Sequence, residues 1–311
     1  MTTFEIGPTD FCKDRVIDGK ALSEAIRQEI EREVHHLTEE HGIPPKLATV
    51  LVGDDPGSKM YVRMKHKACQ KVGILSANYD LPGNTTQDEL LELVRRLNND
   101  PTVHGILVQL PLPRHINEET ILSEIDPLKD VDGFSPRNIY RLFNGAEMLS
   151  AATPQGIAVM LDHLGIELEG KHAVIVNRSN IVGKPLIFLL LNRNMTVTIC
   201  HSRTKDLAQH TRNADVLVTA IGRRKSAEDP FFITADMVKE GAVVIDVATP
   251  YGDCDFESLK CKVSYITPVP GGVGPMTITM LLKNVLASYS FQQAQTNVLS
   301  ADALDYGAYI S

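Results

Sequence analysis

The 311-residue chain has a formal net charge of −8, with 43% hydrophobic and 23% charged residues. This length is enough for one large domain or two ordinary ones, and the hydrophobic content can fill sizeable buried cores. The negative balance gives no general electrostatic support for nucleic-acid binding, so an anionic ligand must be held by local cations and backbone amides.

The cysteine pattern and the lack of long apolar runs indicate in which cellular compartment the protein is expected. The five cysteines are scattered without a CxxC pair, which disfavours a zinc site or a disulfide framework and fits a reduced cytoplasm. The first residues, MTTFEIGPTDFCKDR, show no basic or long apolar leader, and the apolar stretch at 186–191 is too short to span a bilayer. We therefore expect a cytoplasmic protein without a membrane partner.

The first half of the chain alternates predicted helices and strands. Apolar residues recur on one helical face until Gly42 ends the first helix, and Thr86 and Glu89 form a capping box before another. The predicted elements are a helix at 21–41, a strand at 47–53, a helix at about 58–72, a helix after Thr86 and a strand at 104–110.

The second half is typical of a parallel sheet with crossover helices. Thr153-Pro154 predicts an N-cap with proline at the first helical position. Strands are predicted at 173–176, 196–200, 215–220 and 242–247, helices between the first pairs and near 234–240, and a last clear helix at about 276–288. Two α/β units of this kind are expected to meet at a ligand cleft.

The segment NRSNIVGKP, 177–185, lies between the strand at 173–176 and the next helix. It lacks the G-x-G-x-x-G motif, but a loop at this position presents free amides and a helix dipole to phosphate. Gly183 would allow close backbone approach, and Arg178 and Ser179 could hydrogen-bond a phosphate. A dinucleotide site is the favoured interpretation, and a plain strand–helix turn with solvated polar residues is the alternative.

The end of the following strand bears on the choice of cofactor. NAD-specific folds commonly place an acid there, about 20 residues past the glycine motif, to bind the ribose hydroxyls. This chain reads CHSRTK over 200–205, with no acid before Asp206. Ser202 and Arg203, together with Arg178, could receive a 2′-phosphate. The residues therefore favour NADP over NAD, with an exposed basic loop as the alternative.

The helix at 58–72 carries a lysine within a stripe expected to face inward. Tyr61, Lys65, Ala68 and Val72 share one face because they are three or four residues apart. In a cleft, partial desolvation would lower the pKa of Lys65 and make proton transfer accessible. Alternatively, its apolar stem carries the amine out to water.

Two further segments contribute polar candidates. Gln109, near the end of its strand, could hydrogen-bond a lysine amine and a substrate, or simply satisfy the strand end. Three aspartates crowd DPLKDVDG, and turn capping is the expected role of each one judged alone. No histidine or further acidic pattern completes a metal site around them. These aspartates are Asp126, Asp130 and Asp132.

The segment TPVPGGVGPMT, 267–277, is a rigid loop that leads into the last predicted helix. Pro275 suits the first helical turn. Gly271, Gly272 and Gly274 would let the backbone approach a planar ligand. An elaborate linker is the alternative interpretation.

Five segments, YVRMK, GILVQLPLP, KDVDGF, RSNIVGKP and ITPVPGGVGPMT, resemble the bifunctional methylenetetrahydrofolate dehydrogenase/cyclohydrolase family in its own order. The resemblance implies an enzyme that oxidises 5,10-methylenetetrahydrofolate with NADP and hydrolyses the methenyl product to 10-formyltetrahydrofolate. It also implies a homodimer formed through the cofactor domain. The implied α/β fold has a catalytic folate domain at 1–149 joined by the helix at 276–290, a Rossmann-like, doubly wound parallel-sheet domain for NADP at 150–275, and a polar tail at 291–311.

The resemblance further implies roles for the matching residues. Lys65 would be the cyclohydrolase acid/base, supported by Tyr61 and Gln109, and Asp132 would hold the pterin ring of the tetrahydrofolate substrate. No metal is implied. The cofactor residues would be Arg178, Ser179, Val182, Gly183, Ser202 and Arg203. The folate residues would be Tyr61, Gln109, Leu110, Asp132, Pro270, Gly271, Gly272, Gly274 and Thr277.

The chain departs from the family pattern in or beside the cofactor domain. Asn177 stands where the family usually has glycine, Ala151-Ala152 replaces its Pro-Cys, and the segment 248–256 is shorter. These differences leave a NAD-preferring dehydrogenase with weak or absent cyclohydrolase activity as the alternative function. A folate-binding or regulatory protein with a decayed cofactor pocket is a third possibility. It is disfavoured by the retained Tyr61, Lys65, Gln109 and Asp132.

Overall fold

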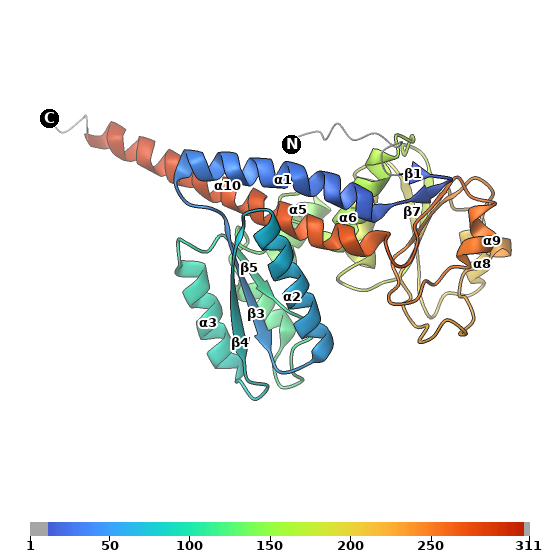
Figure 1. Ribbon diagram of the computed structural model, residues 1–311, viewed down its shortest axis with the longest axis horizontal. Coiled ribbons are helices and arrows are strands. Elements are labelled where there is room, and N and C mark those ends of the chain that lie inside the picture. Colours follow the sequence, from blue (N-terminus) through green and yellow to red (C-terminus); the bar gives the residue numbers. More distant parts are fainter. Residues whose placement is uncertain (1–11, 308–311) are drawn as a thin grey trace. The chain divides into compact units, whose positions relative to one another are not determined.

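The computed structural model describes residues 12–307, with side chains through 295 (Figure 1). Most of the N-terminal segment expected to carry no leader, and the last four residues of the expected polar tail, lie outside the described residues. The chain forms two compact units. Unit 1 comprises Met1–Gln28 and Arg141–Met280, and unit 2 comprises Glu29–Tyr140 and Leu281–Ser311. The domain ranges expected from the sequence stay a prediction.

Unit 2 is built on a three-stranded parallel sheet. Its central strand β3, Lys46–Val52, pairs with β4, Leu75–Leu81, and with β5, Gly105–Val108. Side chains alternate along a strand, and Ala48, Val50 and Val52 pack in one core with the apolar face of helix α3. Helices α2 and α3 lie on opposite sides of this sheet (Figure 1). The helices of this unit are α2, Pro56–Lys71, α3, Gln87–Asn99, and α4, Glu118–Glu124, with α5, Pro136–Phe143, at its boundary.

Strand β4 is absent from the sequence prediction. Its sequence, LSANYDL, mixes polar and apolar residues, and none of its side chains is fully buried. All seven of its residues nevertheless pair in register with β3, from Leu75 beside Lys46 to Leu81 beside Val52. Backbone pairing with a buried neighbour therefore forms this strand without a hydrophobic pattern of its own.

Unit 1 contains a seven-stranded sheet in the order β1-β2-β10-β9-β8-β6-β7. All neighbouring pairs are parallel except the β1–β2 hairpin, which confirms the expected parallel sheet. The strands are β1, Cys12–Lys13, β2, Val16–Ile17, β6, His172–Val176, β7, Thr196–Cys200, β8, Val216–Thr219, β9, Val243–Asp246, and β10, Tyr265–Ile266. The helices among them are α6, Ala152–His163, α7, Gly183–Leu191, α8, Leu207–Thr211, and α9, Phe256–Lys260.

Three predicted helix features differ in the structure. The segment near 234–240 forms only a short 3-10 turn, Ala235–Met237. Helix α6 begins at Ala152 with Ala151 as its N-cap, so the prediction that Thr153 caps it is wrong. The Thr153 hydroxyl lies instead 2.9 Å from the Thr277 hydroxyl, a contact that local sequence cannot reveal. The last helix, α10, runs over Val273–Gly307, beyond the predicted limits.

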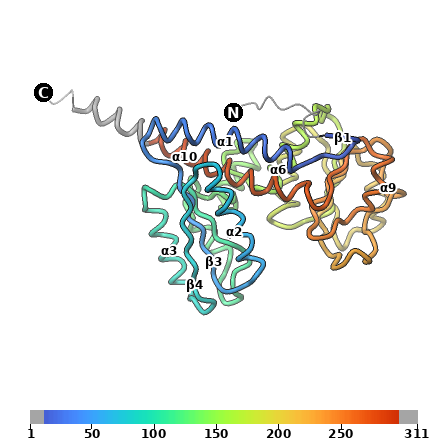
Figure 2. Tube along the Cα trace, in the orientation of Figure 1, coloured from blue at the N-terminus to red at the C-terminus, as the bar shows by residue number. Residues whose placement is uncertain are grey.

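Helices α1, Gly19–His41, and α10 each contribute to both units. Figure 2 shows α1 and α10 running side by side. Within unit 1 the Ser23 hydroxyl lies 2.7 Å from that of Thr279, and Arg27 Nε donates to the Thr279 hydroxyl at 2.8 Å. Within unit 2 the fully buried Tyr289 donates its hydroxyl to Ile43 O at 2.8 Å. The polar contacts along α10 therefore anchor different parts of one helix in different cores. Among the described residues, the helices lack a stretch of the length and hydropathy that a transmembrane span requires.

Candidate active site and dinucleotide crevice

Helix α2 and the end of β5 bring a lysine and a glutamine into direct contact in unit 2. Asp55 caps α2 by accepting a hydrogen bond from Ser58 N, and the helix then carries Lys65 toward the sheet. Gln109 follows β5 directly, and its backbone amide donates to Val50 O at 2.8 Å, which holds it at the strand end. Lys65 Nζ donates to Gln109 Oε1 at 3.0 Å. Gln109 Nε2 donates in turn to Leu110 O at 2.7 Å, so the amide orientation is set.

The pKa of Lys65 is lowered and that of the nearby Asp132 carboxyl is raised, so both shift toward neutral pH. Burial lowers the pKa of the half-buried Lys65 amine, while the charge of Asp132 partly opposes this. Burial raises the pKa of Asp132 to about 6, against the attraction of Lys65 and with a smaller upward contribution from Asp130. Both groups can therefore change protonation state at lower cost than their exposed counterparts.

Asp132 differs from the two aspartates that precede it. Asp126 accepts from Leu128 N at 2.9 Å, and Asp130 accepts from Gly133 N at 3.0 Å and Ser135 N at 2.7 Å. Turn capping is thus the role of these two, as expected. Across residues 12–295, the Asp132 carboxyl has no hydrogen-bond partner, so among these three aspartates it is the one that does not cap a turn.

The expected inward stripe of α2 is only partly correct. Ala68 and Val72 are buried and Lys65 is half-buried, but Tyr61 is 41% exposed. The buried residues in this half of α2 are instead Ser58 and Val62. Tyr61 therefore presents an accessible aromatic face one turn from the Lys65 amine.

In unit 1, the loop after β6 is organised by the side chain of Asn177. Its Oδ1 accepts from Ser179 N at 2.7 Å, the Ser179 hydroxyl at 2.7 Å and Gly183 N at 3.1 Å. The Ser179 hydroxyl also accepts from Val182 N at 3.1 Å. The expectation that this loop offers free amides to a phosphate is therefore wrong for Ser179, Val182 and Gly183.

Gly183 is required for a different reason from the one expected. A Cβ at this position would lie 2.2 Å from Asn177 O and 2.6 Å from Asn177 C. The close backbone approach is thus made by the protein's own chain, because helix α7 begins directly against the end of β6. A larger residue would force these two segments apart.

The cations near this loop are exposed. Arg178, Ser202 and Arg203 lie on the surface, the latter two in the turn after β7. That turn is closed by His201 N donating to the Thr204 hydroxyl at 2.8 Å. Neither guanidinium has a hydrogen-bond or ion-pair partner in the part of the chain that the structure describes. Both are therefore available to an anion, which fits a 2′-phosphate at this edge of the sheet.

The strand order adds a segment that sequence reasoning missed. The order β7-β6-β8 reverses direction at β6, and ligands of such sheets bind beyond the carboxyl ends of the strands at this switch point. The turn after β8, Ala220–Gly222, lies at that point. The buried Asp253 holds it by accepting from Ile221 N at 2.6 Å and Gly222 N at 3.0 Å. Only the sheet order identifies this turn, since its sequence carries no phosphate motif.

The glycine–proline loop is shaped mainly by contacts within unit 1. Gly271 has φ +108° and accepts from Lys20 N at 3.0 Å. A Cβ on Gly272 would lie 2.6 Å from Pro268 O, whereas a Cβ on Gly274 would meet nothing within 4 Å. A Cβ on Gly271 would approach only Pro268 Cγ, at 3.8 Å, an ordinary contact distance. The expectation that all three glycines provide room for a ligand is therefore wrong for Gly272, whose space is filled by its own loop. Pro275 lies in the first turn of α10, as predicted.

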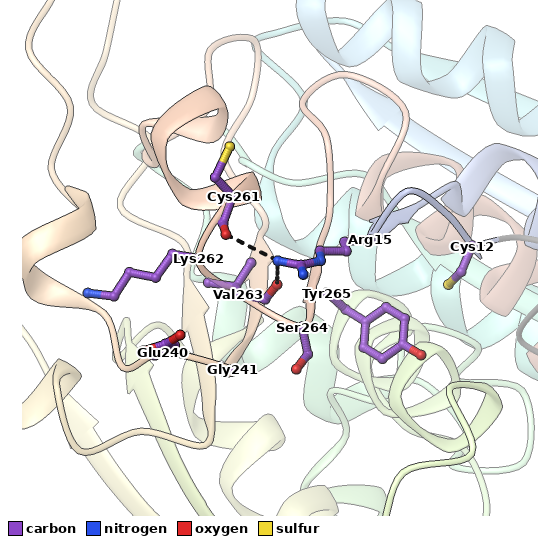
Figure 3. A pocket seen from close by; sticks show the side chains of 9 residues that line it. All are labelled: Cys12, Arg15, Glu240, Gly241, Cys261, Lys262, Val263, Ser264 and Tyr265. Atoms are coloured by element: carbon purple, nitrogen blue, oxygen red, sulfur yellow. Dashed lines mark hydrogen bonds between the residues drawn. The ribbon is translucent and has the colours of Figure 1, made fainter.

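A pocket of about 600 Å³ lies elsewhere in unit 1 (Figure 3). It is found near the amino ends of β9 and β10, whereas the loop after β6 and the turn after β8 lie at the carboxyl ends of their strands. Arg15 Nη1 donates there to Cys261 O at 3.1 Å and Val263 O at 3.4 Å (Figure 3). None of the predicted site residues lines this pocket. In the described part of the chain, no group of three His, Cys, Asp or Glu side chains could hold a metal ion.

Two family models match the chain. Residues 17–132 match the tetrahydrofolate dehydrogenase/cyclohydrolase catalytic domain, and residues 151–293 match the NAD(P)-binding domain of the same family.

Sequence relatives agree over nearly the full length. The chain is 54% identical over 287 residues to a bifunctional protein FolD of Francisella philomiragia, covering 90% of this chain and 98% of the relative. It is 53% identical over 285 residues to a bifunctional protein FolD of Halothermothrix orenii, covering 89% and 98%.

Solved structures give the same result. The bifunctional FolD enzyme of Campylobacter jejuni is 48% identical, with a TM-score of 0.84 and coverage of 88% of this chain and 98% of that one. The Trypanosoma brucei enzyme, solved with NADP and an inhibitor, is 38% identical, with a TM-score of 0.83 and coverage of 88% and 97%. With both family domains matched in order, this chain belongs to the tetrahydrofolate dehydrogenase/cyclohydrolase family and is an enzyme of that family.

Proposed function

We propose that this enzyme oxidises 5,10-methylenetetrahydrofolate with NADP and hydrolyses the methenyl product to 10-formyltetrahydrofolate, with Lys65 as the acid/base of the hydrolytic step. The observation that carries this proposal is the Lys65 amine, half-buried and 3.0 Å from Gln109 Oε1. Family membership supplies the two reactions, and the contact supports the assignment of the residue.

Hydrolysis requires protons to move, and Lys65 is suited to move them. Water adds to the methenyl carbon and loses a proton, and the ring opens when the carbon–nitrogen bond breaks and that nitrogen gains a proton. An amine with a lowered pKa can take the first proton and return the second. The Gln109 oxygen accepts from the amine and thereby fixes the position of Nζ. Proton transfer demands this positioning, since it occurs only within hydrogen-bond reach.

The folate substrate would lie over Tyr61 and Asp132. The exposed Tyr61 ring offers a flat surface one turn from Lys65, and a pteridine ring can stack on it. The Asp132 carboxyl has a pKa of about 6 and can accept hydrogen bonds from ring N–H groups while it is ionised. Leu110, Pro270, Gly271, Gly272, Gly274 and Thr277 complete the folate residues proposed from the resemblance.

The residues of unit 1 fit a phosphorylated dinucleotide. The guanidinium groups of Arg178 and Arg203 have no partner among the described side chains, and the turn after β8 lies at the switch point. Bound NADP would accept a hydride at its nicotinamide ring. Nitrogen lone pairs on the folate drive the hydride away from the methylene carbon. The protein therefore has to orient the reactants, and no protein base is needed. Ser202 and Arg203 support NADP over NAD, and Val182 at the N-terminal boundary of α7 completes the proposed cofactor residues.

The domain ranges 1–149 with 276–290, 150–275 and 291–311 are part of this proposal, as are a cytoplasmic location and a homodimer through the NADP-binding domain. They rest on the resemblance. Size-exclusion chromatography with light scattering would measure the oligomeric state directly, and a monomer at micromolar concentration would refute the dimer.

Parallel dehydrogenase assays with NADP and NAD, each followed by decay of the methenyl absorbance, test the function. We expect a higher kcat/KM with NADP than with NAD, and hydrolysis of the methenyl intermediate. Preference for NAD with little hydrolysis would support the alternative function, for which Asn177 and the short segment 248–256 are the reasons. Binding of folate without turnover would refute both.

A further inference from the structure

Asn177 forms a polar bridge between the two loops at the switch point of the unit 1 sheet. On one side, Oδ1 accepts three hydrogen bonds from the loop after β6. On the other, Nδ2 donates to Ala220 O, after β8, at 2.7 Å. The three donors and the one acceptor determine which amide atom is oxygen and which is nitrogen.

The bridge continues on the far side of Ala220. The next two amides, of Ile221 and Gly222, donate to the buried carboxylate of Asp253, which also accepts from the Thr219 hydroxyl at 2.8 Å. A hydrogen-bonded path therefore runs from the loop after β6 through the turn after β8 to the segment after β9. Each of these segments leaves a strand at its carboxyl end, where the dinucleotide is expected.

Because Asn177 engages the amides of Ser179 and Gly183, they cannot also serve as free donors to a phosphate. The exposed side chains of Arg178 and Arg203 are then left to bind the anionic groups, and their positions depend on the shape of the loop. We propose that Asn177 is a positioning residue for NADP, which holds the β6 and β8 loops at a fixed separation before the cofactor binds. This inference rests on the proposed dehydrogenase function and extends it to a residue at which the chain departs from its family.

The physical reason is preorganisation. A loop that is already ordered loses less conformational entropy when a ligand binds, so affinity rises without a direct contact. Glycine at position 177 would remove all four side-chain hydrogen bonds and add backbone freedom. Part of the ordering cost would then fall on cofactor binding, and the KM for NADP would rise.

The test compares Asn177→Gly with Asn180→Gly in the full-length enzyme. Asn180 lies in the same loop, is exposed, and within residues 12–295 its Oδ1 accepts only from Lys184 Nζ. We expect Asn177→Gly to raise the KM for NADP on the order of tenfold, with kcat within about twofold. Asn180→Gly should leave both unchanged. Asn177→Ser, which retains a short hydroxyl acceptor, should give an intermediate KM.

Hydrolysis of added methenyltetrahydrofolate is the internal control for folding, because that step uses Lys65 and needs no dinucleotide. It should be unchanged in all three variants. A KM for NADP within twofold of wild type in Asn177→Gly, or an equal rise in Asn180→Gly, would overturn the inference. Equal loss of both activities in Asn177→Gly and Asn177→Ser would also overturn it, since the residue would then support the fold as a whole.

Failure of the proposed function gives a different result. If the wild-type enzyme oxidises no methylenetetrahydrofolate with either dinucleotide, the dehydrogenase assignment fails. Calorimetric titration of NADP into the same variants then measures the inference alone, with a weaker Kd expected for Asn177→Gly. An unchanged Kd would refute the positioning role.

Discussion

Replacing Lys65 by methionine separates the two proposed activities. Methionine keeps an unbranched stem of similar length, so packing along α2 is largely retained, and only the amine is lost. Burial lowers the pKa of Lys65, which means that the folded protein disfavours its ammonium form. Removing the amine relieves the cost of burying its charge. This gain offsets part of the stability lost with the 3.0 Å hydrogen bond to Gln109. We therefore expect a change of no more than about 1–2 kcal/mol in the free energy of unfolding.

The effect on hydrolysis should be far larger. General acid–base catalysis contributes about 10²–10⁴-fold to a rate, and Lys65 is the assigned donor and acceptor. Hydrolysis, followed by decay of the methenyl absorbance, should fall by this factor in Lys65→Met. Hydride transfer, followed by NADPH formation, should fall by about tenfold at most because it needs no protein base.

Lys67→Met is the matched control, since Lys67 is exposed on the same helix. It should leave both reactions unchanged. Equal collapse of hydrolysis and hydride transfer in a folded Lys65→Met enzyme would refute the assigned role, as would hydrolysis at the wild-type rate.

Three further changes test the architecture. Gly183→Ala should destabilise unit 1 by about 1–3 kcal/mol, because the added methyl would lie 2.2 Å from Asn177 O; an unchanged melting temperature would contradict that contact. Burial lowers the pKa of His104 from 6.5 to about 4, so the unfolded chain binds more protons between these values. The free energy of unfolding should be greatest above pH 6.5 and fall by up to about 3 kcal/mol as the pH drops to 4, a slope that His104→Asn should reduce in denaturant titrations. Thr86→Ala should lower the free energy of unfolding by about 1 kcal/mol, because it removes the hydroxyl that accepts from Glu89 N in the α3 capping box. A smaller decrease than in an exposed Ser→Ala control would argue against the cap.

Local patterns allowed much of the fold to be predicted. The parallel strands of unit 1 are short apolar runs bounded by polar loops, and β7 matches its predicted range residue for residue. The capping box at Thr86 was predicted from two residues three positions apart and is present in full. Both features depend on near neighbours in the chain, which is why sequence alone sufficed.

Pairwise contacts over long sequence separations were harder to predict. The place of Gln109 at a strand end was enough to predict that it could contact a lysine amine. Which lysine of the neighbouring helix it contacts depends on the helix face that packs against the sheet, and the structure shows that it is Lys65. Among the three aspartates, Asp126 and Asp130 cap turns, whereas Asp132 has no hydrogen-bond partner in the described part of the structure, and this difference is visible only after folding. Sequence spacing cannot distinguish them because all three lie in one short loop.

The sequence by itself determined the family, the α/β class and the order of the motifs, because these depend on residue identity and on local periodicity. Tertiary structure decided the strand order, and with it the switch point that brings the turn at Ala220 beside Asn177. It also decided that Gly183 packs against its own chain and that β4 forms without a hydrophobic pattern. The physical reason is that strand pairing and burial join segments far apart in the chain. The stabilising free energy of these contacts is gained only after the segments have come together.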